Sequence, residues 1–169
     1  MKKIAFIGMM GSGKTTLARI ISEKTGLRCY CTDEYIENKQ GRSISQIFEA
    51  EGENYFRNLE TEALSSIQGD TNVVVSTGGG IVTREVNVDI MKKEGIVVLL
   101  NAKPETIYNR LKDTNTRPIL NNNMNIEFIS DLMGKREDLY NRVKDIEIET
   151  DNKTIREVCF EIIDRLELI

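Results

Sequence analysis

The sequence predicts an α/β fold in which a parallel sheet is covered by helices on both faces. Short apolar, β-prone runs alternate along the chain with stretches of helical periodicity. A glycine-rich turn at 8–15 directly follows the first apolar run and opens a helical stretch. Strands that alternate with helices are joined by right-handed crossovers, which place helices on both faces of the sheet.

Each element follows from the local pattern. The expected strands are short and mostly apolar: 3–7, 27–32, 73–75, 96–100 and 146–149. The expected helices repeat apolar residues every three to four positions: from the glycine turn to about Gly26, from 34 to about 68 with breaks near Gly41 and Gly52, about 83–93, from Pro104, about 125–142, and from Thr154. Ser43 and Ser45 are candidate caps within the long helical segment. The polar, asparagine-rich segment 114–123 is typical of a mobile surface loop.

Length and composition fit one soluble domain of 169 residues, 40% hydrophobic and 30% charged. The net charge of −4 does not favour nucleic acid or an anionic membrane as a partner. The apolar runs are shorter than a bilayer span, and we expect the first residues to form a strand instead of a signal peptide. The absence of histidine excludes a His-based triad and a His/Cys metal centre. Cys29, Cys31 and Cys159 are expected to be free thiols in a reducing cytoplasm, with Cys159 packed in the core.

Residues 8–15 read GMMGSGKT and match G-x-x-x-x-G-K-[ST], the pattern of a phosphate-binding loop. Backbone N–H groups and the N-terminus of the following helix would point together at the β- and γ-phosphates of a nucleotide. We expect the Lys14 ammonium against those phosphates and the Thr15 hydroxyl on the accompanying Mg²⁺. The alternative, a flexible Gly/Ser turn beside an exposed lysine, does not explain the eight matched positions and their flanks.

Asp33 ends the second expected strand, at the sheet edge where open α/β folds bind their ligands. Its carboxylate could orient and deprotonate an acceptor hydroxyl. It could also serve as the N-cap of a helix beginning at Glu34, and the two roles can coexist.

Four arginines and a triple glycine complete the candidate site. Arg57, Arg110, Arg117 and Arg136 carry fork-shaped guanidinium groups that suit a carboxylate or a phosphate. Each helical arginine taken alone also fits a solvated face or an ion pair along its helix. The glycines at 78–80 end a strand, and we expect close approach of a ligand there, because a tight turn needs only one glycine.

Taken together, these motifs resemble the shikimate kinases in residue type, order and spacing, over essentially the whole chain. The resemblance is carried by residues 8–15, Asp33, the FRNLE run at 56–60, the glycines at 78–80, the RPIL run at 117–120 and Arg136. It implies the fold of the nucleoside monophosphate kinases: one P-loop NTPase domain over 1–169, with a five-stranded parallel sheet sandwiched by helices, a substrate-binding segment at about 33–60 and a lid at about 112–124. The implied reaction transfers the γ-phosphoryl group of ATP to the 3-hydroxyl of shikimate. That reaction belongs to aromatic amino acid (chorismate) biosynthesis and implies a cytoplasmic, Mg²⁺-dependent monomer.

The resemblance also implies a role for each site residue. Three would be catalytic: Lys14, Asp33 as base toward the 3-hydroxyl, and Arg117, which the lid would bring to the transferred phosphoryl group. The shikimate-binding residues would be Asp33, Arg57, Gly78, Gly79, Gly80 and Arg136, with the two arginines on the carboxylate. The nucleotide-binding residues would be Gly11, Ser12, Gly13, Lys14, Thr15, Thr16, Arg110 and Arg117, with Arg110 along the adenine. Thr15 would be the metal ligand. A closed lid would exclude the water that otherwise hydrolyses ATP.

Cys31 departs from the family pattern, which has Asp-x-Asp at the end of the second strand where this chain has Cys31-Thr32-Asp33. A neutral thiol cannot supply the charge of the first carboxylate, and it is a soft ligand for Mg²⁺. We therefore expect a weaker metal requirement or a lower turnover, with the same reaction. A reactive-cysteine role is less favoured than packing, because no cation in the sequence nearby lowers the thiol pKa.

Two other functions stay open from the sequence. The first is a small-molecule kinase for another acceptor, such as gluconate or a nucleoside monophosphate; the Phe56-Arg57 pair and the triple glycine disfavour it. The second is a nucleotide-binding protein that has lost catalysis, with Cys31 as the mark of that loss. Retention of Lys14, Asp33 and Arg117 disfavours this second alternative.

Overall fold

The structure is a computed structural model that describes residues 3–93, 95–113 and 124–169. Five strands form one sheet in the order β2-β3-β1-β4-β5, and every neighbouring pair is parallel. The strands are β1 (Lys3–Ile7), β2 (Arg28–Cys31), β3 (Val73–Ser76), β4 (Ile96–Asn101) and β5 (Ile146–Glu149). The predicted five-stranded parallel sheet is therefore confirmed.

The helices alternate with the strands, as the periodicity predicts. They are α1 (Lys14–Thr25), α2 (Thr32–Gln40), α3 (Ile44–Ser65), α4 (Glu85–Lys93), α5 (Pro104–Leu111), α6 (Ile126–Val143) and α7 (Ile155–Arg165), with a short 3₁₀ turn η1 (Ile81–Thr83) before α4. Pro104 is the first residue of α5, where its missing N–H costs no hydrogen bond. The segment 114–123, which contains Arg117 and most of the expected lid, lies outside the described residues.

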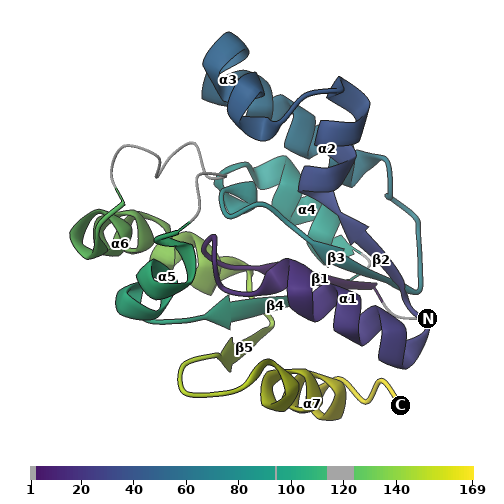
Figure 1. The fold of residues 1–169 in the computed structure, drawn as a ribbon. Coiled ribbons are helices and arrows are strands. Elements are labelled where there is room, and N and C mark those ends of the chain that lie inside the picture. Colours follow the sequence, from purple (N-terminus) through teal and green to yellow (C-terminus); the bar gives the residue numbers. More distant parts are fainter. Residues whose placement is uncertain (1–2, 94, 114–123) are drawn as a thin grey trace.

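The two faces of the sheet bury different helices because strand side chains alternate between faces. Ile4 and Phe6 of β1 pack with the apolar sides of α1 and α7, whereas Ala5 and Ile7 pack with residues of α3, α4, α5 and α6. Cys159 is fully buried in the first of these layers, as expected for a free thiol in the core. Figure 1 shows α7 below the sheet and the α2–α3 pair projecting at the opposite end of the molecule.

The α2–α3 pair has a small core of its own, whose buried members are Ile36, Ile47, Phe56, Leu59 and Ala63. Ser43 caps α3: its Oγ accepts from the backbone N–H of Gln46, and the Gln46 side chain accepts from the backbone N–H of Ser43. Ser45 lies inside the helix, so of the two candidate caps only Ser43 is one. At Gly52 the backbone (φ 82°, ψ 176°) breaks the helical geometry and divides α3 into two segments.

The C-terminal ends of β1, β2 and β3 meet at one edge of the sheet. The glycine-rich loop follows β1, the triple glycine follows β3, and α2 begins directly after β2. This is the edge where parallel sheets bind ligands, because strand ends and helix N-termini converge there. No helix in the described ranges is long and apolar enough to cross a membrane.

Candidate active site

The loop after β1 takes a conformation that depends on glycine. Gly8 has φ 141°, and a Cβ there would overlap the carbonyl oxygen of Leu100 on the neighbouring strand. Gly13, with φ 96°, is the N-cap of α1. The loop can therefore pass close to β4 and deliver the chain into α1 with its first N–H groups directed outward, which is the geometry of a phosphate-binding loop.

Lys14 begins α1 and is buried, with 7% of its surface exposed. Its Nζ donates to the carbonyl oxygens of Gly8 and Met9, both at 2.8 Å. The ammonium group is thus held inside the loop by the loop's own backbone. A cation in this position, together with the helix N-terminus, makes the loop a binding site for phosphate.

The next residue, Thr15, lies against the end of β3. Its Oγ1 is 2.9 Å from Oγ of Ser76, and either hydroxyl can be the donor. Ser76 pairs in register with Cys31 of β2, so a thiol lies beside these two hydroxyls. Burial raises the pKa of the Cys31 thiol, which therefore carries no charge at neutral pH. The structure thus agrees with the expectation that Cys31 cannot replace a carboxylate.

Lys14 and Asp33 line the same cavity, which has a volume of about 260 Å³. Its wall consists of loop residues, one acid, one arginine and the segment after β3: Met10, Gly11, Gly13, Lys14, Thr15, Thr16, Asp33, Thr77, Gly78, Gly79 and Arg110. The sequence predicts that a phosphate-binding cation and an acid line one cavity, and Lys14 and Asp33 do so.

Asp33 belongs to the first turn of α2 and not to the strand end, because β2 stops at Cys31 and α2 begins at Thr32. The alternative in which Asp33 caps a helix starting at Glu34 is wrong, since Cys31 occupies the N-cap position. A carboxylate in the first turn of a helix is stabilised in its charged form by the helix dipole.

Behind the cavity lies a buried cluster of charges. Arg57 and Arg136 are only 7% and 6% exposed, and Glu60 is completely buried. Nη1 of Arg57 donates to Oε2 of Glu60 at 2.7 Å, and Nη2 donates to Oε1 of Glu53 at 2.9 Å. For both arginines the solvated-face interpretation is therefore wrong, whereas the ion pair along the helix is confirmed for Arg57. Arginines so deeply buried next to a cavity are suited to hold an anion.

Glu60 and Glu53 are members of this cluster that sequence reasoning did not assign to the site. A signal for them was present, because they lie three residues after and four residues before Arg57 on one helix. Burial raises the pKa of Glu60 and the nearby Asp33 carboxylate adds to the rise, although the adjacent Arg57 opposes it. Oε1 of Glu60 is buried without a hydrogen-bond partner among the described residues.

The triple glycine is explained by the side chains of this cluster. A Cβ at Gly78 would overlap Oε1 of Glu60, and a Cβ at Gly80 would overlap the guanidinium of Arg57. We expected ligand approach to explain the three glycines, but their immediate neighbours at positions 78 and 80 are charged protein side chains. The glycines are needed so that the backbone after β3 can pass directly over the cluster.

Tyr140 and Arg136, four residues apart on α6, both lie next to Gly79. The Tyr140 hydroxyl donates to the Gly79 carbonyl oxygen at 2.5 Å, and burial raises the pKa of this tyrosine, so it stays a donor at neutral pH. A Cβ at Gly79 would lie 3.2 Å from Nη1 of Arg136, the same nitrogen that contacts Sδ of Met9 at 3.9 Å. Arg136 thus lies between the phosphate-binding loop and the triple glycine.

Arg110, near the end of α5, lines the cavity from the other side. Its Nη1 donates to the carbonyl oxygen of Gly11 at 3.1 Å, and both terminal nitrogens lie 3.4 Å from Oγ1 of Thr150. It therefore connects the phosphate-binding loop to the segment after β5. Its expected position along an adenine stays a prediction.

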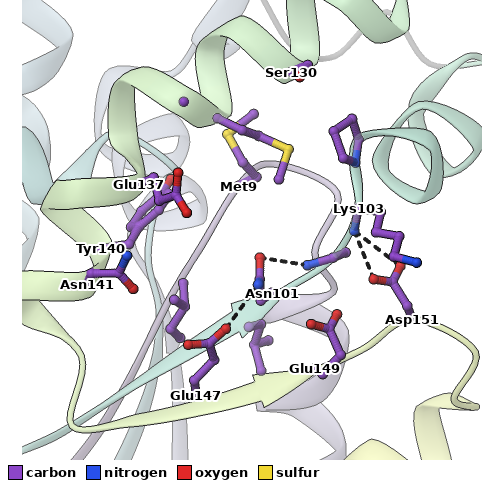
Figure 2. A pocket seen from close by; sticks show the side chains of 16 residues that line it. Met9, Asn101, Lys103, Ser130, Glu137, Tyr140, Asn141, Glu147, Glu149 and Asp151 are labelled. Carbon is purple, nitrogen blue, oxygen red and sulfur yellow. Dashed lines mark hydrogen bonds between the residues drawn. The ribbon is translucent and has the colours of Figure 1, made fainter.

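A second, larger cavity of about 390 Å³ lies between α6 and the ends of β4 and β5. Figure 2 shows Asn101 of β4, Glu147 and Glu149 of β5, and Glu137 and Tyr140 of α6 around it. The phosphate-binding lysine and Asp33 do not line it. Among the described residues the two cavities have no lining residue in common, and the Tyr140 hydroxyl, bonded to Gly79, connects their walls.

Three features define the class of this protein as a P-loop kinase of small molecules. They are a glycine loop after a central strand of a parallel sheet, a buried lysine at the start of α1, and an acid that faces both across one cavity. The sequence model of the shikimate kinase family matches residues 10–167. A shikimate kinase of Dehalococcoides mccartyi is 42% identical over 163 residues, covering 96% of this chain and 92% of that protein. The chain belongs to the shikimate kinase family.

Solved structures agree with this assignment. A shikimate kinase from Acinetobacter baumannii, determined in complex with shikimate, has a TM-score of 0.94 at 34% identity, covering 99% of this chain and 93% of that one. A shikimate kinase from Aquifex aeolicus has a TM-score of 0.83 at 36% identity, covering 98% of this chain and 96% of that one. The similarity extends over nearly the full length in both cases.

Proposed function

We propose that this protein transfers the γ-phosphoryl group of ATP to the 3-hydroxyl of shikimate and releases ADP and shikimate 3-phosphate. Family membership and the full-length similarity to shikimate kinases support the proposal. The observation that carries it is the single cavity lined by Lys14 and Asp33, with Arg57 and Arg136 buried behind it. Such an arrangement provides a place for a nucleotide phosphate and another for a small carboxylic acid.

At the phosphate end, the backbone of the loop and Lys14 would bind the β- and γ-phosphates. The Thr15 hydroxyl is a hard oxygen donor next to Ser76 and fits a single ligand to Mg²⁺. Within the described ranges no group of three or more His, Cys, Asp or Glu side chains could hold a metal ion, so the other ligands would come from phosphate oxygens and water. Bound there, Mg²⁺ would neutralise charge on the phosphates.

At the acceptor end, Asp33 would accept the proton of the attacking hydroxyl and hold that hydroxyl in line with the γ-phosphorus. Arg57 and Arg136 would bind the shikimate carboxylate and so fix the ring relative to Asp33. The α2–α3 unit, with its separate core, would be the substrate-binding segment expected at about 33–60. The predicted role of Arg117 stays a prediction, because residue 117 lies outside the described residues.

Shikimate-dependent release of ADP, followed in a coupled assay, tests this function. We expect activity with shikimate and none with gluconate or a nucleoside monophosphate. Replacing Asp33 by Asn should lower kcat by about 10²- to 10⁴-fold, the usual contribution of a general base. Asp164→Asn, which removes an exposed carboxylate from α7, is the matched control and should leave kcat unchanged.

Two results would contradict the proposal. ATP binding by calorimetry without any shikimate-dependent ADP would indicate a nucleotide-binding protein that has lost catalysis. An Asp33→Asn variant that turns over at the wild-type rate would remove Asp33 from the mechanism.

A further inference from the structure

The guanidinium of Arg57 binds two carboxylates that differ sharply in burial. Glu60, on Nη1, has a completely buried side chain. Glu53, on Nη2, has a side chain that is 58% exposed. Moving Glu60 away from Arg57 would leave a buried charge without its partner, whereas Glu53 can turn into water at little cost. Of the two partners, only Glu53 can leave easily.

The kink in α3 gives Glu53 this freedom. The non-helical backbone of Gly52 ends the first helical segment, so Glu53 begins the second one. Its negative charge is favoured at that helix N-terminus whether or not it contacts Arg57. From there the i,i+4 spacing brings its carboxylate to Nη2 of Arg57 at 2.9 Å.

Arg57 does not need Glu53 to stay in position. Its Nη1 is bonded to the buried Glu60, its guanidinium packs against Gly80, and it lies 5.5 Å from the centre of the Phe56 ring. A substrate carboxylate that reaches Arg57 while both glutamates remain would place three like charges around one guanidinium. The exposed carboxylate is the one whose release relieves this repulsion at least cost.

We propose that Glu53 occupies Arg57 in place of the substrate carboxylate and is displaced when the substrate binds. The inference rests on the proposed function, because it takes Arg57 as a carboxylate-binding residue. Glu53 then sets the affinity of this position: it weakens binding of every anion at Arg57 by the same amount. Only an acceptor that gains further contacts, at Arg136 and Asp33, overcomes this competition.

Neutralising Glu53 with little change of shape tests the proposal. In Glu53→Gln we expect KM for shikimate to fall by about two- to five-fold, the equivalent of releasing one exposed ion pair. The dissociation constant for shikimate, measured by calorimetry without nucleotide, should fall equally. The change should appear in KM for shikimate and not in KM for ATP. With the uncharged methyl ester of shikimate, the gain in affinity should disappear.

Glu51→Gln is the matched control. Glu51 lies on the same helix, its side chain is 43% exposed, and it pairs with Arg42 at 3.2 Å. The variant loses the same charge without touching Arg57, so its KM for shikimate should equal that of the wild type.

Three outcomes with the variants would overturn the inference. A higher KM in Glu53→Gln would mean that Glu53 positions Arg57 for the substrate. An equal fall in both variants would mean that the overall charge of the helix is responsible. An unchanged KM would mean that Glu53 does not compete.

If the wild type binds shikimate but releases no ADP, the proposed function fails, and the calorimetric comparison still decides the role of Glu53. A wild type that does not bind shikimate overturns both.

Discussion

At the scale of single residues, Cys31 determines how much negative charge lies beside the phosphate-binding loop. It pairs in register with Ser76, whose hydroxyl contacts that of Thr15. Burial raises the pKa of the thiol, so this corner of the site presents two hydroxyls and a neutral sulfur. Any charge on Mg²⁺ there must be balanced by the nucleotide and by more distant acids, because thiols bind Mg²⁺ poorly.

Replacing Cys31 by Asp should therefore lower the Mg²⁺ concentration that gives half the maximal rate. The physical reason is that a carboxylate next to Thr15 would attract the ion or its bound water. The measurement is a magnesium titration of the coupled assay at saturating ATP, together with the calorimetric affinity for MgADP. Cys31→Ser is the control, because it introduces an oxygen ligand without a charge. Its half-maximal Mg²⁺ concentration should differ little from that of the wild type. An Asp variant with wild-type magnesium dependence would show that this carboxylate is dispensable here.

At the scale of elements, α3 carries the buried Arg57 and Glu60, and its start is fixed by a capping box. Oγ of Ser43 accepts from the N–H of Gln46 at 3.2 Å, and Oε1 of Gln46 accepts from the N–H of Ser43 at 2.9 Å. The cap sets where the first segment of α3 begins, and the non-helical backbone at Gly52 sets where the second segment begins. Local chemistry at Ser43 and Gln46 thus fixes the start of the first segment of α3.

Ser43→Ala should lower the free energy of unfolding by about 1 kcal/mol, because an N–H in the first turn of α3 loses its acceptor. Urea denaturation monitored by circular dichroism measures the change. Ser45→Ala is the control, since Ser45 lies within the helix and makes no cap, and its effect should be smaller. Equal losses in the two variants would contradict the assignment of the cap to Ser43.

At the scale of the whole molecule, the buried charges couple folding to pH. Glu60 comes from α3, Arg136 from α6 and Asp33 from α2, and these meet only when the sheet has formed. Burial raises the pKa of Glu60 above its ordinary value of 4.5. A carboxyl whose pKa is raised by folding binds a proton more readily in the folded state, so its contribution to stability is fully present below the unfolded pKa. That contribution is lost as the pH rises through the folded pKa.

The difference in free energy of unfolding between the wild type and Glu60→Gln should therefore fall as the pH rises from 4.5 through the raised pKa. Each unit by which the pKa is raised corresponds to about 1.4 kcal/mol of this difference. Urea denaturation of both proteins across this pH range gives the two curves. The Glu60→Gln curve is the baseline for the wild-type curve, because glutamine does not titrate. A difference that grows with pH would mean that Arg57 holds the folded pKa below 4.5.

Much of the fold was predictable because its signals are local. The valine run at 73–75, the strand at 146–149 and the proline at the start of α5 were predicted to within a residue of their observed bounds. The end of β2 was placed one residue late, so Asp33 was assigned to a strand end when it belongs to the first turn of α2. A helix start with cysteine at the N-cap gives no recognised capping signal.

The candidate site was predictable only in part. Lys14 and Thr15 were found by their motif, because the backbone that binds phosphate is contiguous in the chain. The burial of Arg57 and Arg136 was not predictable from either helix alone, where solvent exposure is the commoner state for an arginine. Glu53 carried a local signal, its spacing of four residues from Arg57, but only the structure shows that this face of α3 meets the triple glycine.

The sequence by itself determined the alternation of strands and helices, the phosphate-binding loop and the reaction class, because each is encoded by neighbouring residues. The tertiary structure alone decided that Asp33 shares a cavity with Lys14, that Gly78 and Gly80 make room for Glu60 and Arg57, and that Tyr140 holds Gly79. These contacts join segments far apart in the chain. They form only when the strand order brings the ends of β1, β2 and β3 together at one edge of the sheet.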